Sequence, residues 1–221
     1  MMFDFIVTGS NGFLGKEVSN QLKKTSYISY MQNDFIIALA WPEGMVSACG
    51  SWYDVFFAKN KKYRVGHSAL VLVESITGNL RYFDFGRYHT PKDFGRVRDI
   101  ETDGDVTIKT IAKIEKNQIT NLKEILLEIK KKESFHGEGT LYASILNDVS
   151  YSKAYKYAKK IQKNGLIPYG PFVYNGTNCS RFVASVMRSS SPTYIKNARL
   201  KFPISVSPSP KRNVGIANAN F

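Results

Sequence analysis

The chain has 221 residues, of which 43% are hydrophobic and 13% aromatic, a composition that excludes wholesale disorder and allows a sizeable core. Its apolar runs are too short to cross a bilayer, and two cysteines are too few for a disulfide framework or a cysteine-rich zinc site. The net charge of +13 is spread along the faces of expected helices, so we expect solvated lysines and not nucleic-acid binding as the main function.

Residues 1–30 predict a strand followed by a helix, joined by a glycine-rich turn. Gly9, Gly12 and Gly15 have the spacing that lets backbone N–H groups approach a pyrophosphate at a helix N-terminus. The opening FIVTGSNGFLG resembles the start of the extended short-chain dehydrogenase/epimerase family, and this resemblance implies NAD(P) binding. An NAD(P)-binding protein of that kind is therefore one alternative for the function.

The resemblance to that family ends with residue 30. A dinucleotide site expects a second strand that ends in Asp or Glu, whereas Asp34 stands at the start of the next strand. Tyr155 and Lys159 have the spacing of the family's catalytic pair, but tyrosine and lysine are frequent enough here for chance to account for it. We therefore expect no cofactor and interpret residues 1–30 as a βα appendage, which a fused coding segment or a second translation start at Met31 would explain.

Residues 31–221 predict one α+β domain, because strands and hairpins come first and helices follow. Strands are expected at residues 35–41, 66–74, 80–85, 97–101 and 107–114, the second and third joined as a hairpin. Helices are expected at residues 52–57, 122–129 and 150–163 and after Asn178, followed by an extended C-terminal tail.

A histidine that opens a strand and a cysteine that opens a helix are the clearest chemical signal. Cys179 follows a Gly-Thr-Asn turn, where the unpaired N–H groups of the helix lower the pKa of a thiol and can stabilise an oxyanion. His67 can act as the base that takes the thiol proton and later protonates the leaving group. Together they predict a thiol nucleophile with an imidazole partner.

The two segments GHSALVLV and GTNCSRFV resemble the permuted members of the NlpC/P60 papain-like superfamily, the group of lecithin:retinol acyltransferase-like and YiiX-like proteins, over about residues 34–188. The resemblance implies an antiparallel sheet with packed helices in which the histidine strand precedes the cysteine helix. It also implies a thiol hydrolase or acyltransferase that acts on an amide or ester of a peptide, a cell-wall fragment or a lipid.

The same resemblance implies a third polar residue that orients the imidazole from the strand after the histidine. Asp84 is our candidate, and His89 is the rival. A hairpin centred between Thr77 and Gly78 would pair His67 with Tyr88 and put Asp84 on the same face of the sheet as His67.

Other interpretations stay open. Cys179 shares a helix face with Phe182 and Val183, so it could be an inert core thiol of a non-catalytic binding module. Cys49 is a weaker nucleophile candidate, because papain order would require a distant downstream histidine, and His136 lies in an expected loop. We expect no metal site, since the three histidines lie in separate segments without ligand spacing.

Three arginines, Arg87, Arg96 and Arg98, would either favour an anionic substrate or be solvated surface residues. The N-terminus shows no secretory signal, so we expect a cytoplasmic protein. The expected partner is a small-molecule, peptide or lipid substrate, and the oligomeric state is left open.

Overall fold

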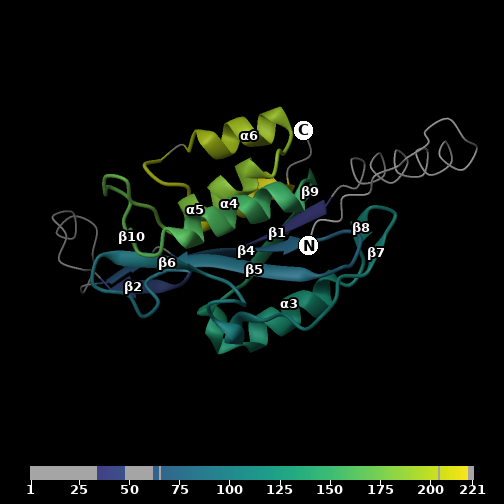
Figure 1. Ribbon diagram of the computed structural model, residues 1–221, viewed down its shortest axis with the longest axis horizontal. Helices are drawn as coiled ribbons and strands as arrows, with labels where there is room; N and C mark the ends of the chain where they lie inside the picture. The colour runs from purple at the N-terminus through teal and green to yellow at the C-terminus, as the bar shows by residue number, and fades with distance from the viewer. Residues whose placement is uncertain (1–33, 48–61, 65, 204, 219–221) are drawn as a thin grey trace, which may run out of the picture. The chain divides into compact units, whose positions relative to one another are not determined.

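The computed structural model describes residues 34–47, 62–64, 66–203 and 205–218 (Figure 1). All of them belong to one compact unit. The predicted appendage at residues 1–30, Cys49 and the helix expected at residues 52–57 lie outside the described residues.

A six-stranded sheet in the order β10-β6-β5-β4-β1-β9 forms the centre of this unit, and every pair of neighbours is antiparallel. Its strands are β1 (Asp34–Trp41), β4 (His67–Val73), β5 (Leu80–Gly86), β6 (Phe94–Arg98), β9 (Tyr142–Val149) and β10 (Ile167–Pro168). Two small ribbons pair β2 (Met45–Ser47) with β3 (Lys62–Arg64) and β7 (Ile114–Glu115) with β8 (Gln118–Ile119). The antiparallel α+β architecture expected from the sequence is confirmed.

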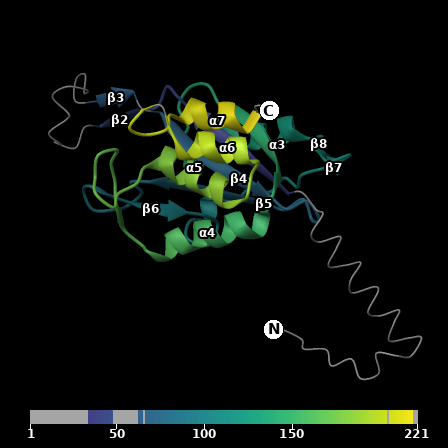
Figure 2. The same cartoon turned by 90° about the horizontal axis from the view of Figure 1, so that it is seen from above.

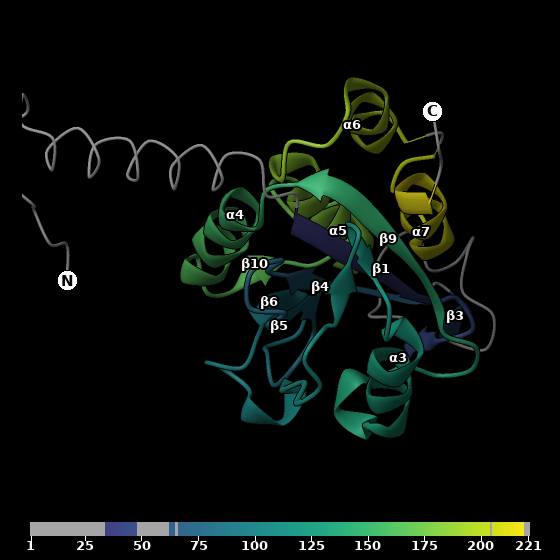
Figure 3. The ribbon, with the colours of Figure 1, turned by 90° about the vertical axis from the view of Figure 1, so that its right-hand side faces the viewer.

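Helices cover both faces of the sheet, which is why the central strands β1 and β4 are apolar almost throughout. One face carries α4 (Tyr151–Lys163), α5 (Cys179–Ser189), α6 (Tyr194–Lys201) and α7 (Pro210–Asn218), as Figures 1 and 2 show. Helix α3 (Leu122–Lys131) lies on the opposite side (Figure 3). Alternate residues of β1 and β4 therefore enter two separate cores: Ile36 and Leu70 pack with α5, whereas Ile37 and Val71 pack with α3.

The strand expected at residues 107–114 is wrong, because only Ile114 belongs to a strand. The carboxylate of Glu128 on α3 accepts the main-chain N–H groups of Lys109 and Thr110 at 2.8 Å each, so a side chain takes the place of a neighbouring strand. The strand expected at residues 97–101 runs instead from Phe94 to Arg98 and ends where the chain turns.

Two further differences concern the second half of the chain. The sequence does not predict strand β9 (Tyr142–Val149), because exposed and buried residues do not alternate regularly along it. The prediction of an extended C-terminal tail is also wrong, because this part of the chain contains α6 and α7. Pro210 occupies the first position of α7, where a proline is well tolerated.

Candidate active site

The first pair of the candidate site is His67, the first residue of β4, and Asp84 on β5. The Nε2 atom of His67 lies 3.2 Å from Oδ2 of Asp84. The ladder pairs Ala69 with Asp84 and Val73 with Leu80, a register two residues away from the one expected. The shift in register comes from the hairpin loop, in which Gly78 adopts a φ of +71° and donates its N–H to the carbonyl of Glu74 at 2.8 Å. The true register brings Asp84 nearer to His67 than predicted.

Asp84 is completely buried and surrounded by donors. Its Oδ2 atom accepts from the hydroxyls of Tyr82 at 2.9 Å and Tyr88 at 2.8 Å, and from Nη2 of Arg98 at 2.7 Å. Burial opposes ionisation, but the hydrogen bonds and charges of His67 and Arg98 outweigh it and lower the pKa of Asp84. The side chain is therefore a carboxylate in the folded protein.

The imidazole of His67 is held from several sides. The Trp41 ring stacks on it with a centroid distance of 5.8 Å, and the Tyr88 hydroxyl lies 3.3 Å from Nε2. Burial would lower the pKa of His67, but hydrogen bonds to Asp84 and Cys179 raise it to about 9. Because Nε2 faces the carboxylate, Nδ1 is the ring nitrogen left for the thiol. His89, the rival for the third position, is exposed.

Cys179 is the first residue of α5 and is 7% exposed. Asn178 caps this helix, since its side-chain oxygen accepts the N–H of Arg181 at 3.0 Å. Burial opposes ionisation of the thiol, but the hydrogen bond and charge of His67, with the main-chain N–H of Ser68, lower the pKa of Cys179 below its ordinary value. The structure thus brings Asp84, His67 and Cys179 together: the carboxylate is hydrogen-bonded to the imidazole, and the imidazole interacts with the thiol.

Tyr169 is a further residue of the site that the sequence did not indicate. It lies beside Cys179, since burial first and then the nearby Cys179 thiol raise the pKa of its hydroxyl well above the ordinary value. An isolated bridge to Thr177 and a ring stacked on Phe85 at 5.7 Å fix its place beside the start of α5. Tyr169 comes from an irregular segment after β10, so no periodic pattern could have identified it.

The three arginines have different surroundings. Arg96 forms an ion pair with both carboxylate oxygens of Asp103, at 2.7 and 2.6 Å, and Arg98 is bound to Asp84. The Arg87 guanidinium lies over the ring of Tyr169, 5.2 Å from its centroid. Of the three, Arg87 therefore lies against Tyr169, the residue beside Cys179.

A model of the family described as Type VI secretion system effector TseH-like matches residues 36–195 of the chain. The chain belongs to this family. Among solved structures, the crystal structure of the Type VI secretion system effector TseH aligns with a TM-score of 0.56 and 23% sequence identity, covering 85% of this chain and 88% of that chain. No curated protein matches the chain.

Membership of the TseH-like family supports the papain-like superfamily that the sequence predicted, and a cysteine hydrolase is compatible with it. Within residues 34–47, 62–64, 66–203 and 205–218, no helix is long and apolar enough to cross a membrane. The same part of the chain holds no group of three side chains suited to a metal ion.

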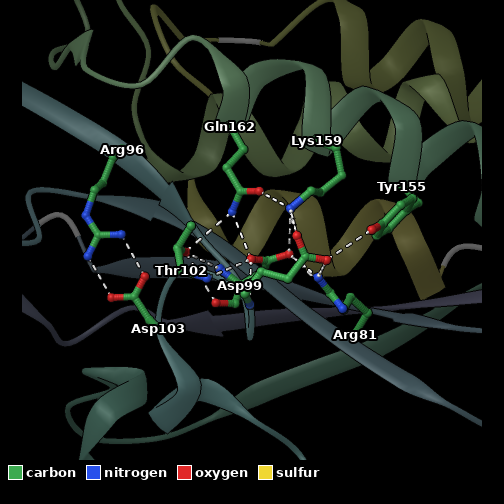
Figure 4. A network of polar contacts seen from close by, with 9 residues as sticks. Arg81, Arg96, Asp99, Thr102, Asp103, Tyr155, Lys159 and Gln162 are labelled. Carbon is green, nitrogen blue, oxygen red and sulfur yellow. Dashed lines mark hydrogen bonds and ion pairs between the residues drawn. The ribbon is translucent and has the colours of Figure 1, made fainter.

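In this TseH-like protein, Tyr155 and Lys159 belong to a network of ion pairs and hydrogen bonds and do not form a dehydrogenase-type catalytic pair (Figure 4). Lys159 reaches from α4 to Asp99 at 3.2 Å and to Glu101 at 2.8 Å, and it also contacts Gln162. Tyr155 donates to Glu101 at 3.4 Å, a weak hydrogen bond. These contacts tie α4 to the turn after β6.

Proposed function

We propose that the protein is a cysteine-dependent hydrolase in which Cys179 is the nucleophile, His67 the base and Asp84 the residue that orients His67. The observation that carries the proposal is a buried carboxylate hydrogen-bonded to an imidazole, which in turn interacts with a thiol at a helix N-terminus. A thiol whose pKa is lowered and an imidazole whose pKa is raised favour the thiolate–imidazolium pair.

In the proposed reaction, the Cys179 thiolate attacks the carbonyl carbon of an amide or ester, and the electron pair of the C=O bond moves to oxygen. N–H groups at the start of α5 and the Tyr169 hydroxyl are suited to stabilise that oxyanion. When the oxyanion collapses, the imidazolium of His67 gives its proton to the leaving amine or alcohol. Neutral His67 then takes a proton from water, which attacks the thioester and releases the acid and the thiol.

The order of the site residues supports a permuted papain-like arrangement, since the strand that carries His67 precedes the helix that carries Cys179. The narrower likeness to YiiX-like and lecithin:retinol acyltransferase-like proteins is part of this proposal. Transfer to an acceptor other than water would turn the same thioester chemistry into acyl transfer, with no cofactor required.

We further propose that the chain acts as a Type VI secretion system effector, the role of its structural relative TseH. For such an effector we propose an amide bond of a peptide or of a cell-wall fragment as the substrate, with a lipid ester as the alternative. The cytoplasmic location expected from the sequence stays a prediction.

The test is the rate at which iodoacetamide alkylates Cys179 between pH 5 and 9, followed by mass spectrometry of the full chain. We expect wild-type Cys179 to react at pH 6 and His67→Ala to abolish that reaction, because the thiolate would lose its imidazolium partner. His89→Ala, which changes an exposed histidine, is the matched control and should react as the wild type does.

A Cys179 that stays inert until the protein is unfolded would contradict the proposal. It would then be a core thiol, and the chain would be a non-catalytic module. A reactive Cys179 justifies a screen of amide and ester substrates, with Cys179→Ser as the inactive reference.

A further inference from the structure

Arg98 lies directly opposite Asp84 in the β5–β6 ladder and is only 3% exposed. Its Nε binds Oδ1 of Asp84 at 3.1 Å and its Nη2 binds Oδ2 at 2.7 Å. A planar guanidinium that binds both oxygens of a carboxylate fixes the orientation of that carboxylate as well as its charge. Arg98 is therefore a buried partner of Asp84 and is not placed to bind an anionic substrate.

The Arg98 guanidinium is itself held on two further sides. Its Nη2 also donates to the carbonyl of Ser134 at 3.0 Å. Its carbon Cζ lies 3.4 Å from the centroid of the Tyr88 ring, a cation–π contact. An arginine with this many partners occupies one rotamer, so it can transmit a fixed geometry to the carboxylate.

Tyr88 connects the same guanidinium to the imidazole. Its hydroxyl donates to Oδ2 of Asp84 and lies 3.3 Å from Nε2 of His67. The ring can fold back over the end of β5 only because residue 86 is glycine, since a Cβ at Gly86 would lie 2.4 Å from the Tyr88 ring. The hydroxyl of the half-buried Tyr88 thus contacts both members of the His67–Asp84 pair.

We propose that Arg98 is a positioning residue of the active site. By binding both oxygens of Asp84 and by seating the Tyr88 ring, it keeps the carboxylate aimed at Nε2 of His67, so that Nδ1 points to Cys179. This inference rests on the proposed function, because positioning matters only where His67 and Cys179 act together.

Positioning and simple charge make opposite predictions for His67. If Arg98 acted on His67 only as a nearby cation, its removal would raise the pKa of His67, because a positive charge disfavours the imidazolium. If Arg98 positions Asp84, its removal loosens the His67–Asp84 hydrogen bond and the pKa of His67 falls. Arg98→Lys keeps the charge but cannot bind both oxygens, so it separates the two effects.

The experiment is an NMR titration of the imidazole of His67 between pH 5 and 10 in the full chain, with the signal assigned by its absence in His67→Gln. Wild-type His67 should titrate at about 9. For Arg98→Met and for Arg98→Lys we expect a pKa lower by about one unit or more, and for Tyr88→Phe a smaller fall. Alkylation of Cys179 at pH 6 should fall about tenfold for each unit by which the thiol pKa rises.

Arg81→Met is the matched control, because Arg81 lies on the same sheet and forms ion pairs with Asp99 and Glu101 in the turn after β6, but does not contact the site. It should leave the pKa of His67 unchanged. Near-UV circular dichroism establishes that each variant is folded. Tyr88→Phe, which loses one hydroxyl and keeps the ring, provides the test if the Arg98 variants do not fold.

A folded Arg98→Met or Arg98→Lys in which the pKa of His67 is unchanged or higher would overturn the positioning role. If the Arg98 variants do not fold, an unchanged pKa of His67 in Tyr88→Phe would do the same. If the proposed function itself is wrong, a different result is expected: the alkylation rate of Cys179 would be the same in the wild type and in His67→Ala. The titration of His67 is measured without any substrate, so the two failures remain distinguishable.

Discussion

Trp41 and His67 lie opposite each other in the β1–β4 ladder, and their rings stack with an angle of 26° between the planes. The residue before His67 makes this contact possible. Gly66 has a φ of +69°, and a Cβ at this position would lie 2.6 Å from the carbonyl oxygen of Trp41. The chain can therefore enter β4 beside Trp41 only through a glycine.

Gly66→Ala should destabilise the protein by more than about 2 kcal/mol, because a left-handed backbone and a clash with main-chain atoms act together. Urea unfolding measures the free energy. Gly104→Ala is the control, since a Cβ there meets no atom within 4 Å, and it should change stability by less than about 0.5 kcal/mol. Equal midpoints for the two variants would show that the φ at Gly66 does not matter.

The cap of α5 gives a second prediction. Asn178→Ala removes the acceptor for the N–H of Arg181 and should cost about 1 kcal/mol of stability. Asn178→Asp keeps an acceptor and so should retain the stability, but its charge should raise the pKa of the neighbouring Cys179 thiol and slow alkylation at pH 6. If Asn178→Asp reacts faster than the wild type, the thiol does not sense the charge at the start of the helix.

The raised pKa of His67 predicts the alkaline limit of catalysis. The imidazole binds its proton more tightly than a free histidine, so it stays a proton donor up to about pH 9 and loses that role above it. Hydrolysis of an anilide should therefore fall above pH 9, since the leaving amine must receive a proton. Hydrolysis of the p-nitrophenyl ester of the same acid should show no such fall, because its leaving group departs without a proton. A fall above pH 9 for both substrates would argue against His67 as the proton donor.

The ion network on α4 predicts a stability effect that is confined to one lysine. Asp99 is completely buried, and its pKa is low because hydrogen bonds of Gln162, Arg81 and Lys159 outweigh burial. Lys159→Met removes one of these donors and should cost about 1–2 kcal/mol in thermal or urea unfolding. Lys160→Met, at the exposed neighbouring position, should stay within about 0.5 kcal/mol of wild type, and a loss as large as that of Lys159→Met would contradict a specific role for the network.

The places of His67 at the start of a strand and of Cys179 at the start of a helix could be predicted because each follows a strong local signal, whereas Asp84 came from the family resemblance. Gly66 marks the start of a strand, and the Gly-Thr-Asn turn marks the start of a helix. The register between β4 and β5 could not be predicted as well, because it depends on a loop whose length is set by the φ of Gly78.

The surroundings of the pair could not be predicted at all. Arg96 and Arg98 are two positions apart on one strand, yet Arg96 binds Asp103 and Arg98 binds Asp84. Which arginine faces which carboxylate depends on where β6 starts and on its pairing with β5, and both are tertiary properties. Tyr169 reaches Cys179 from a segment without periodicity, so only the folded chain brings them together.

The position of β1 in the sheet has a consequence for how the chain folds. One neighbour, β4, follows closely in sequence, but the other, β9, pairs with β1 only after a loop of about 100 residues has closed. Until then β1, which is buried along nearly its whole length, is an open and apolar sheet edge. We therefore expect slow folding, and aggregation of chains interrupted before Tyr142, because β9 and the cysteine of the site both come late in the sequence.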